Sequence, residues 1–452
     1  MNRLRAAACG LGAGLLLVAV PVQATATTST DPDDGLWYFT KTQTAERHET
    51  TTGKGVQIAV IDTAINPDVP ELQGVDLHVR EPSYCAAQAG GTAMPAAADD
   101  PAAAHGTGMV SLIVGNGKGI GGERGLLGIA PDAEVHFYAN MTLPADADVR
   151  CPQTAYDPDA GVDTGWFARA IDQAVADGAD IISISLGVSL PLDAPAVARA
   201  LHAGVVIVAA EPDDDTGYPA RLNGVVGVDS IGPDGQVWQG AGGGKVVAPG
   251  EQIRAFTEEF DGYHLTNGSS SATAYTAGAL ALVWSAYPDA TANQILQTLV
   301  RNTDGEDHEL YFDEKYGYGV VNVRHMLEHD PTTYPDENPL LSDDPDAVPS
   351  IAEIADPTPL AAATPSEAPT AAPSGEPTSA TSEQPTPGDD ATADDSDSTV
   401  PLLVGAAAIV AALVAVVGLA VRRARSTRGG ADGADAAPPT HRPGQDPRPG
   451  GQ

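Results

Sequence analysis

Short apolar runs alternate with helical stretches between about Leu36 and Glu328, and this alternation is the strongest constraint on the fold. Runs rich in β-branched residues, at 55–62, 135–139, 181–187 and 205–209, are typical of buried strands, and 225–228 and 246–248 are shorter examples. Helical patterns occupy 105–115, 165–177 and 194–202, and two more helices follow Ser270. Parallel strands need long crossover connections, which are usually helices. The sequence therefore predicts an α/β fold with a mostly parallel central sheet.

The two ends of the chain have compositions that differ from this middle part. Residues 1–26 carry Arg3 and Arg5, then an apolar run from Leu11 to Val22, then small residues, which predicts a secretory signal peptide. Residues 330–399 are dominated by Pro, Ser, Thr, Ala and acidic residues, which predicts a disordered tether. The folded domain, with a short N-terminal extension, is therefore expected to occupy residues 27–329.

An almost uninterrupted apolar segment at residues 400–421 is long enough to cross the hydrocarbon core of a bilayer, which is about 30 Å thick. Arg422, Arg423, Arg425 and Arg428 follow it at once. Because positive residues stay inside, the tail at 422–452, basic and then rich in Pro and Gly, is expected to be cytoplasmic. The sequence thus predicts a single-pass protein of the cell membrane whose folded domain is extracytoplasmic.

The net charge and the cysteines limit which classes of partner and bound group can be expected for the mature chain. A formal net charge of −38 excludes nucleic acid as a natural partner, because a phosphate binder needs a basic face. Cys85 and Cys151 both survive removal of the signal peptide, and in an oxidising compartment a disulfide between them is the default expectation. Neither has a His or Cys neighbour at ligand spacing, so no metal site and no cofactor are predicted.

A glycine and a run of small hydroxyl residues open the helix that is expected after residue 268. Gly268 precedes Ser269, Ser270 and Ser271, and an apolar helical stretch follows. A serine here would lie at the positive end of a helix, where developing negative charge is favoured. The residues alone do not separate the serines from one another, and for this stretch taken alone an ordinary helix cap is the preferred interpretation.

Two further residues could activate a serine in this stretch as a nucleophile. Asp62 ends a predicted strand and His105 begins a predicted helix, although a turn aspartate and a solvated histidine are the simpler interpretations of each alone. A serine hydroxyl becomes a nucleophile when a base takes its proton, and a histidine base needs a carboxylate to fix its tautomer. The chain order Asp, His, Ser is that of the subtilisin type of serine protease.

The local sequences resemble those of subtilisin-like serine proteases (subtilases, peptidase S8). Asp62-Thr63-Ala64, His105-Gly106-Thr107-Gly108 and Gly268-Ser269-Ser270-Ser271-Ala272 are similar to the three catalytic boxes of that family. The resemblance selects Ser270 as the nucleophile, His105 as the base and Asp62 as the orienting acid. It also implies a three-layer fold, and a strand at Ser185, Leu186 and Gly187 that pairs with a protein or peptide substrate. Ala248-Pro249-Gly250 and Gly317-Tyr318-Gly319 are supporting similarities.

The whole architecture resembles the mycosins, which are membrane-anchored subtilases associated with type VII secretion in actinobacteria. The resemblance implies an extracytoplasmic serine endopeptidase that is anchored through its C-terminal helix. It also implies partners among the components of a type VII secretion system.

The sequence departs from the family pattern at two positions. Ala64 stands where the family has glycine, a small change if the backbone φ there is negative. After the strand at 205–209, the chain reads Ala209-Ala210-Glu211-Pro212 where the family has Ala-Ala-Gly-Asn, whose amide helps to form the oxyanion hole. Asn223 or Asn267 could supply a substitute donor. Without one, the alternative is a catalytically impaired pseudoprotease that serves as a structural or binding subunit of a secretion complex. A stalked adhesin is a third interpretation, which leaves the three boxes unexplained.

Overall fold

The computed structural model describes residues 34–85, 93–140, 167–211, 217–238, 243–305 and 308–360. The predicted signal peptide, the membrane-spanning segment 400–421 and the tail 422–452 lie outside these ranges, and so does the predicted tether beyond residue 360. None of the helices within these ranges is both long and apolar enough to cross a membrane. The membrane anchor therefore stays a prediction.

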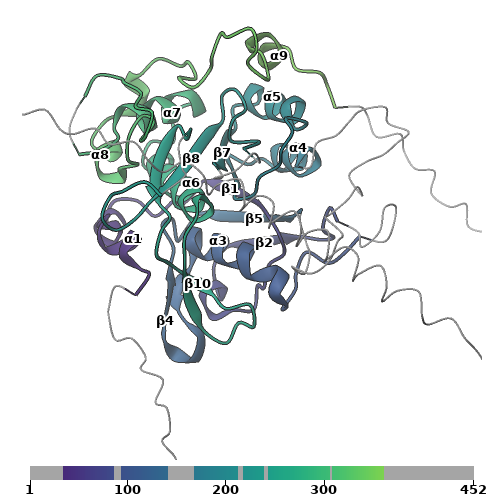
Figure 1. The fold of residues 1–452 in the computed structure, drawn as a ribbon, viewed down its shortest axis with the longest axis vertical. Coiled ribbons are helices and arrows are strands. Elements are labelled where there is room, and N and C mark those ends of the chain that lie inside the picture. Colours follow the sequence, from purple (N-terminus) through teal and green to yellow (C-terminus); the bar gives the residue numbers. More distant parts are fainter. Residues whose placement is uncertain are drawn as a thin grey trace, which may run out of the picture. The chain divides into compact units, whose positions relative to one another are not determined.

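A seven-stranded sheet lies at the centre of the domain, and all its neighbouring strands pair in parallel (Figure 1). The strand order is β2-β5-β1-β6-β7-β8-β9. The strands are β1 (Gln57–Asp62), β2 (Leu77–Arg80), β5 (Glu134–Ala139), β6 (Ile181–Ile184), β7 (Val206–Ala210), β8 (Val226–Ile231) and β9 (Val246–Pro249). The predicted α/β fold with a mostly parallel sheet is confirmed, and β2 is an edge strand that the sequence patterns did not reveal.

Alternate residues of β1 face two separate cores. Ile58 and Val60 of β1 pack on the side of helices α3 (Ala104–Val114) and α6 (Ser269–Ala286). Ala59 and Ile61 pack on the side of α4 (Ala168–Ala176) and α5 (Ala194–His202). Because both faces are covered here, the inner strands are mostly apolar runs, as expected of a buried parallel sheet.

Short elements surround this frame. The hairpins are β3 (Asn116–Lys118) with β4 (Arg124–Leu127), and β10 (Ile253–Phe256) with β11 (Tyr263–Thr266). The remaining helices are α1 (Trp37–Thr40), α2 (Thr44–Arg47), α7 (Ala292–Arg301), α8 (Val323–Leu327) and α9 (Ile351–Ala355), and single 3₁₀ turns occupy Pro70–Leu72, Pro101–Ala103, Ile120–Gly122 and Pro331–Thr333.

The N-terminal extension is part of the domain core. Leu36, Trp37 and Tyr38 are buried among the core residues of the α3 and α6 side. The Tyr38 hydroxyl donates to the Leu127 carbonyl at 2.8 Å, and the Trp37 indole donates to the Glu251 carbonyl at the same distance. Removing this segment would therefore uncover apolar surface and unpair buried polar groups.

The predicted C-terminal boundary of the domain at residue 329 is too early. Residues 330–360 lie on the domain, and their α9 packs against α5. The Asn223 side-chain amide donates to the carbonyl groups of Ser342 and Pro349 at 3.1 and 3.0 Å. The composition of this segment suggests disorder, but polar side chains of the domain satisfy its backbone groups and hold it in place.

Candidate active site

Asp62 is the last residue of β1, at the carboxyl end of the sheet, and its side chain is fully buried. Its Oδ1 accepts a hydrogen bond from the Thr63 backbone N–H at 2.7 Å. The same oxygen lies 2.6 Å from His105 Nδ1. Because a carboxylate can only accept, Nδ1 carries the proton, which leaves Nε2 free to act as a base.

A close approach between α3 and the loop after β1 places His105 over Asp62. A Cβ on the next residue, Gly106, would lie only 2.4 Å from the Ala64 carbonyl oxygen and 2.9 Å from the Phe137 ring. Glycine is therefore required at this position. Ala64 itself is not among the residues with positive φ, so its methyl group causes no backbone strain.

The environment of His105 acts on its basicity in two directions. Burial lowers the pKa of the imidazole, whereas the charge of Asp62 and the hydrogen bond to it raise the pKa, and the net effect is a pKa above the ordinary 6.5. The side chain remains 39% exposed, so a substrate can reach it. An imidazole with this environment suits a general base that works at neutral to mildly alkaline pH.

The turn before α6 is packed so closely against Gly250 that a side chain on this glycine would clash. The Gly268 N–H donates to the Gly250 carbonyl at 2.9 Å. A Cβ on Gly250 would lie 2.5 Å from Ser230 Cβ and 2.6 Å from the Gly268 oxygen. Helix α6 begins directly after this turn, with Ser269 and Ser270 in its first turn. Backbone N–H groups at this position have no partner within the helix, so they can stabilise an oxyanion.

Ser270 and Ser185 are joined by a reciprocal pair of hydrogen bonds. The Ser270 hydroxyl donates to the Ser185 carbonyl at 3.1 Å, and the Ser185 hydroxyl donates to the Ser270 carbonyl at 3.0 Å. The structure thus brings the segment Ser185, Leu186 and Gly187, which follows β6, to the predicted nucleophile. In this arrangement the Ser270 hydroxyl hydrogen points to the Ser185 carbonyl, so it has to turn towards His105 before the serine can attack.

The residue before the position expected to supply the second oxyanion donor is acidic. Glu211 follows β7 with only 1% of its surface exposed, and its Oε1 lies 2.5 Å from Arg221 Nε. Burial raises the pKa of the Glu211 carboxyl group, and Arg221 partly offsets this rise. Pro212, Asp213, Asp214 and Asp215 lie outside the described residues.

Of the two asparagines that could substitute for this donor, Asn223 does not take that role in the structure. The Asn223 amide is committed to the Ser342 and Pro349 carbonyls of the C-terminal segment. The Asn267 Oδ1 accepts from the Gln252 backbone N–H at 2.7 Å, which fixes the orientation of its amide. The first-turn N–H groups of α6 remain available as oxyanion donors.

Cys85, one partner of the predicted disulfide, is fully buried after β2, and its sulfur takes part in a disulfide. Cys151 lies outside the described residues, so the pairing of these two cysteines stays a prediction.

Comparison with known proteins agrees with this arrangement. The model of the subtilase family (Peptidase_S8) matches residues 53–319. Subtilisin E of Bacillus subtilis strain 168 is 28% identical over 288 residues, which is 60% of this chain and 66% of that protein. The thermostable alkaline protease of Halalkalibacterium halodurans is 30% identical over 299 residues, covering 64% of this chain and 72% of that protein. The matched region thus spans slightly less than two thirds of the length of Subtilisin E.

Among solved structures, MycP1 from the ESX-1 type VII secretion system has the same fold. The TM-score is 0.50 at 22% sequence identity, and the match covers 68% of this chain and 91% of that one. At this identity the likeness describes the fold alone.

Proposed function

The chain belongs to the subtilase family, and we propose that it is a serine endopeptidase that uses Asp62, His105 and Ser270 as its catalytic triad. The observation that carries the proposal is the 2.6 Å contact between His105 Nδ1 and Asp62 Oδ1 at the carboxyl end of the sheet. Active sites of open α/β sheets lie at this end. The start of α6 supplies the third residue of the set.

The mechanism follows from the chemistry of the three side chains. His105 Nε2 takes the hydroxyl proton of Ser270, whose oxygen attacks the substrate carbonyl to form a tetrahedral intermediate. Asp62 stabilises the resulting imidazolium, and the first-turn N–H groups of α6 face the oxyanion. His105 then returns the proton to the leaving amine, and water hydrolyses the acyl-enzyme by the same steps. Residues 185–187 would align the substrate as an added strand.

A fluorophosphonate probe tests whether a serine is activated. We expect the full-length protein to be labelled once, on Ser270, because the probe reacts with a serine that has an adjacent base. Mass spectrometry of the labelled peptide separates Ser269, Ser270 and Ser271. Folded protein that stays unlabelled, or that is labelled at a different serine, would contradict the proposal.

The location of the activity forms the second part of the proposal. The predicted signal peptide, the predicted span at 400–421 and the arginines after it place the protease domain outside the cell membrane. The fold that this chain shares with MycP1 of a type VII secretion system supports a role beside such a system. Its substrates would then be exported proteins or peptides.

One observation favours the second candidate, a pseudoprotease that acts as a binding or structural subunit. Pro212, which follows Glu211, stands where the family has the asparagine whose amide points at the oxyanion. Loss of this amide donor costs about 10²–10³ in rate in subtilisin itself. The remaining helix N–H groups would support slow catalysis.

Restoring the family residues should accelerate the reaction. We expect the double substitution Glu211→Gly and Pro212→Asn to raise kcat by roughly 10²-fold, because it removes a carboxylate and adds an amide donor. Peptide hydrolysis by purified protein measures the gain, and Glu211→Gly alone serves as the control that adds no donor. An unchanged kcat in the folded double variant would show that the missing amide is not what limits the rate.

A further inference from the structure

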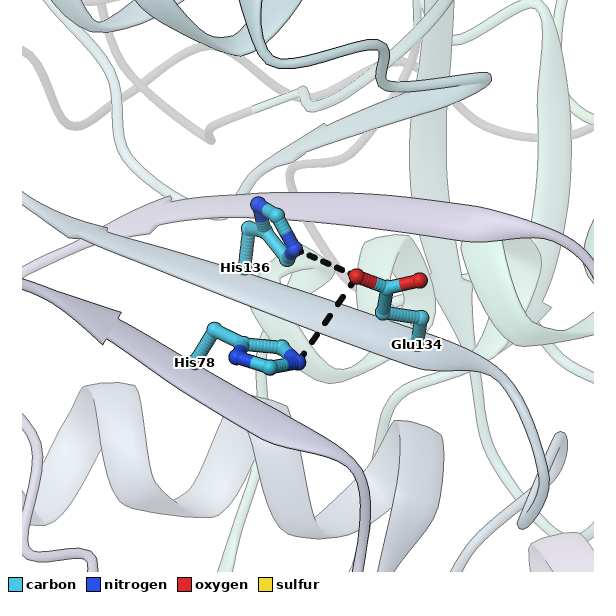
Figure 2. A group of neighbouring side chains, drawn as sticks. All are labelled: His78, Glu134 and His136. Carbon is cyan, nitrogen blue, oxygen red and sulfur yellow. Dashed lines mark hydrogen bonds and ion pairs between the residues drawn. The ribbon is translucent and has the colours of Figure 1, made fainter.

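Two histidines and a glutamate meet on strands β2 and β5, and all three side chains converge (Figure 2). Glu134 Oε1 lies 2.7 Å from His136 Nε2 and 3.7 Å from His78 Nε2. One ligand atom from each residue lies within 4.8 Å of the other two. The two imidazole rings lie edge to face, with their centroids 4.9 Å apart.

The pairing of the strands produces this arrangement. Glu134 and His136 are two residues apart on β5, so their side chains share one face of the sheet. His78 pairs directly with His136 in the parallel register, so its side chain lies on the same face. Asp76 adds a carboxylate beside them, with its Oδ1 3.0 Å from His78 Nε2.

We propose that His78, Glu134 and His136 bind a divalent transition-metal ion, with Zn²⁺ as the species that best fits the donor set. Two imidazoles and a carboxylate suit zinc far better than calcium or magnesium, which prefer oxygen ligands. Tetrahedral zinc holds its ligand atoms about 3.3 Å apart, given bonds of about 2.0–2.1 Å. The observed separations of 2.7 and 3.7 Å bracket this value. Asp76 or a water molecule completes the coordination.

The surroundings suit an ion that arrives from solvent and is then held firmly. The side chains of His78 and Glu134 are 52% and 42% exposed, so the ion can enter, while that of His136 is only 9% exposed. The Gln57 amide lies 3.5 Å from His136 Nδ1. When Nε2 binds the metal, the ring proton moves to Nδ1, and the oxygen of a reoriented Gln57 amide can accept it.

The position of the site indicates a structural role. Glu134 begins β5, whereas Ala139 at the other end of β5 pairs with Asp62. His136 and Glu134 lie three and five residues before Ala139, so at about 3.3 Å per residue the ion would lie roughly 10–16 Å along the sheet from the triad. Strand β2 is at the edge of the sheet and pairs with β5. The metal would therefore crosslink the edge strand β2 to β5 and stabilise the fold. It would take no part in catalysis.

Metal titration of the untagged full-length protein tests the proposal. After treatment with a chelator, we expect one equivalent of Zn²⁺ to bind in calorimetry and to raise Tm, and Co²⁺ to give the absorption bands of a tetrahedral site. Ca²⁺ should have neither effect. Binding that does not saturate at one equivalent, or equal binding of Ca²⁺, would overturn the assignment.

Substitutions locate the ion. His78→Ala and the near-isosteric Glu134→Gln should each weaken Zn²⁺ binding at least tenfold and abolish the rise in Tm, because a ligand is lost. His264→Ala is the matched control, since His264 is an exposed strand histidine away from the cluster. Unchanged Zn²⁺ affinity in both cluster variants, or an equal loss in His264→Ala, would place the ion elsewhere. Labelling by the fluorophosphonate probe should be the same in all these proteins.

Discussion

Replacing Ser270 by alanine lowers kcat for peptide hydrolysis by on the order of 10⁶-fold, as the loss of the nucleophile does in subtilisin itself. The reason is that the hydroxyl oxygen forms the covalent intermediate, and alanine has no atom that can do so. Hydrolysis of a chromogenic peptide, followed over hours at high enzyme concentration, measures the remaining rate.

Ser269→Ala is the matched control, because Ser269 occupies the preceding position of the same helical turn. We expect it to keep activity within a small factor of that of the original protein. The Ser270 variant should also keep its Tm, since it loses one hydroxyl group that is not fully buried. A Ser270 variant that remains fully active would remove the basis for the proposed mechanism.

Asp62→Asn should lower kcat by about 10⁴-fold, the effect known for the equivalent change in a serine protease triad. The amide of asparagine can donate a hydrogen bond to Nδ1, which would leave the proton on Nε2, the atom that has to accept it from Ser270. Steady-state kinetics with the same peptide measures the loss. A loss below tenfold would show that Asp62 does not orient the base.

The pH profile gives a second measure of the same contact. Asp62 raises the pKa of His105 through its charge and its hydrogen bond, while burial lowers it. Catalysis needs the neutral imidazole, so activity rises with pH through this pKa and is lost in acid. Without the carboxylate only the lowering effect of burial is left, and the acid limb of the kcat/KM profile should move to lower pH in the variant.

The strands and helices that carry the triad are predictable because local patterns and tertiary packing agree there. The buried run ending at Asp62 has apolar residues on both faces, as a covered parallel strand requires. Helix α5 begins and ends at the residues expected from its pattern. The proximity of Ser185 to Ser270 follows from the family resemblance, but their reciprocal hydrogen bonds depend on side-chain rotamers that a sequence does not encode.

Long-range contacts explain what sequence patterns miss. Helix α4 begins at Ala168, later than expected, and the Asp193 carboxylate accepts from the Phe167 N–H at 2.7 Å across a separation of 26 residues. Strand β2 is short and half exposed, so its alternation is weak. The cluster of His78 with Glu134 and His136 depends on the pairing of that strand, and no pattern along the chain relates the three residues without it.

The attachment of residues 330–360 to the domain changes how far the protease can work from the membrane. If the span begins at residue 400 as predicted, residues 361–399 are left to bridge the gap, in place of residues 330–399. A fully extended chain covers at most about 3.4 Å per residue, which limits the reach to roughly 130 Å instead of about 240 Å. Substrates that meet Ser270 would then be those that pass close to the bilayer, such as polypeptides leaving an export channel.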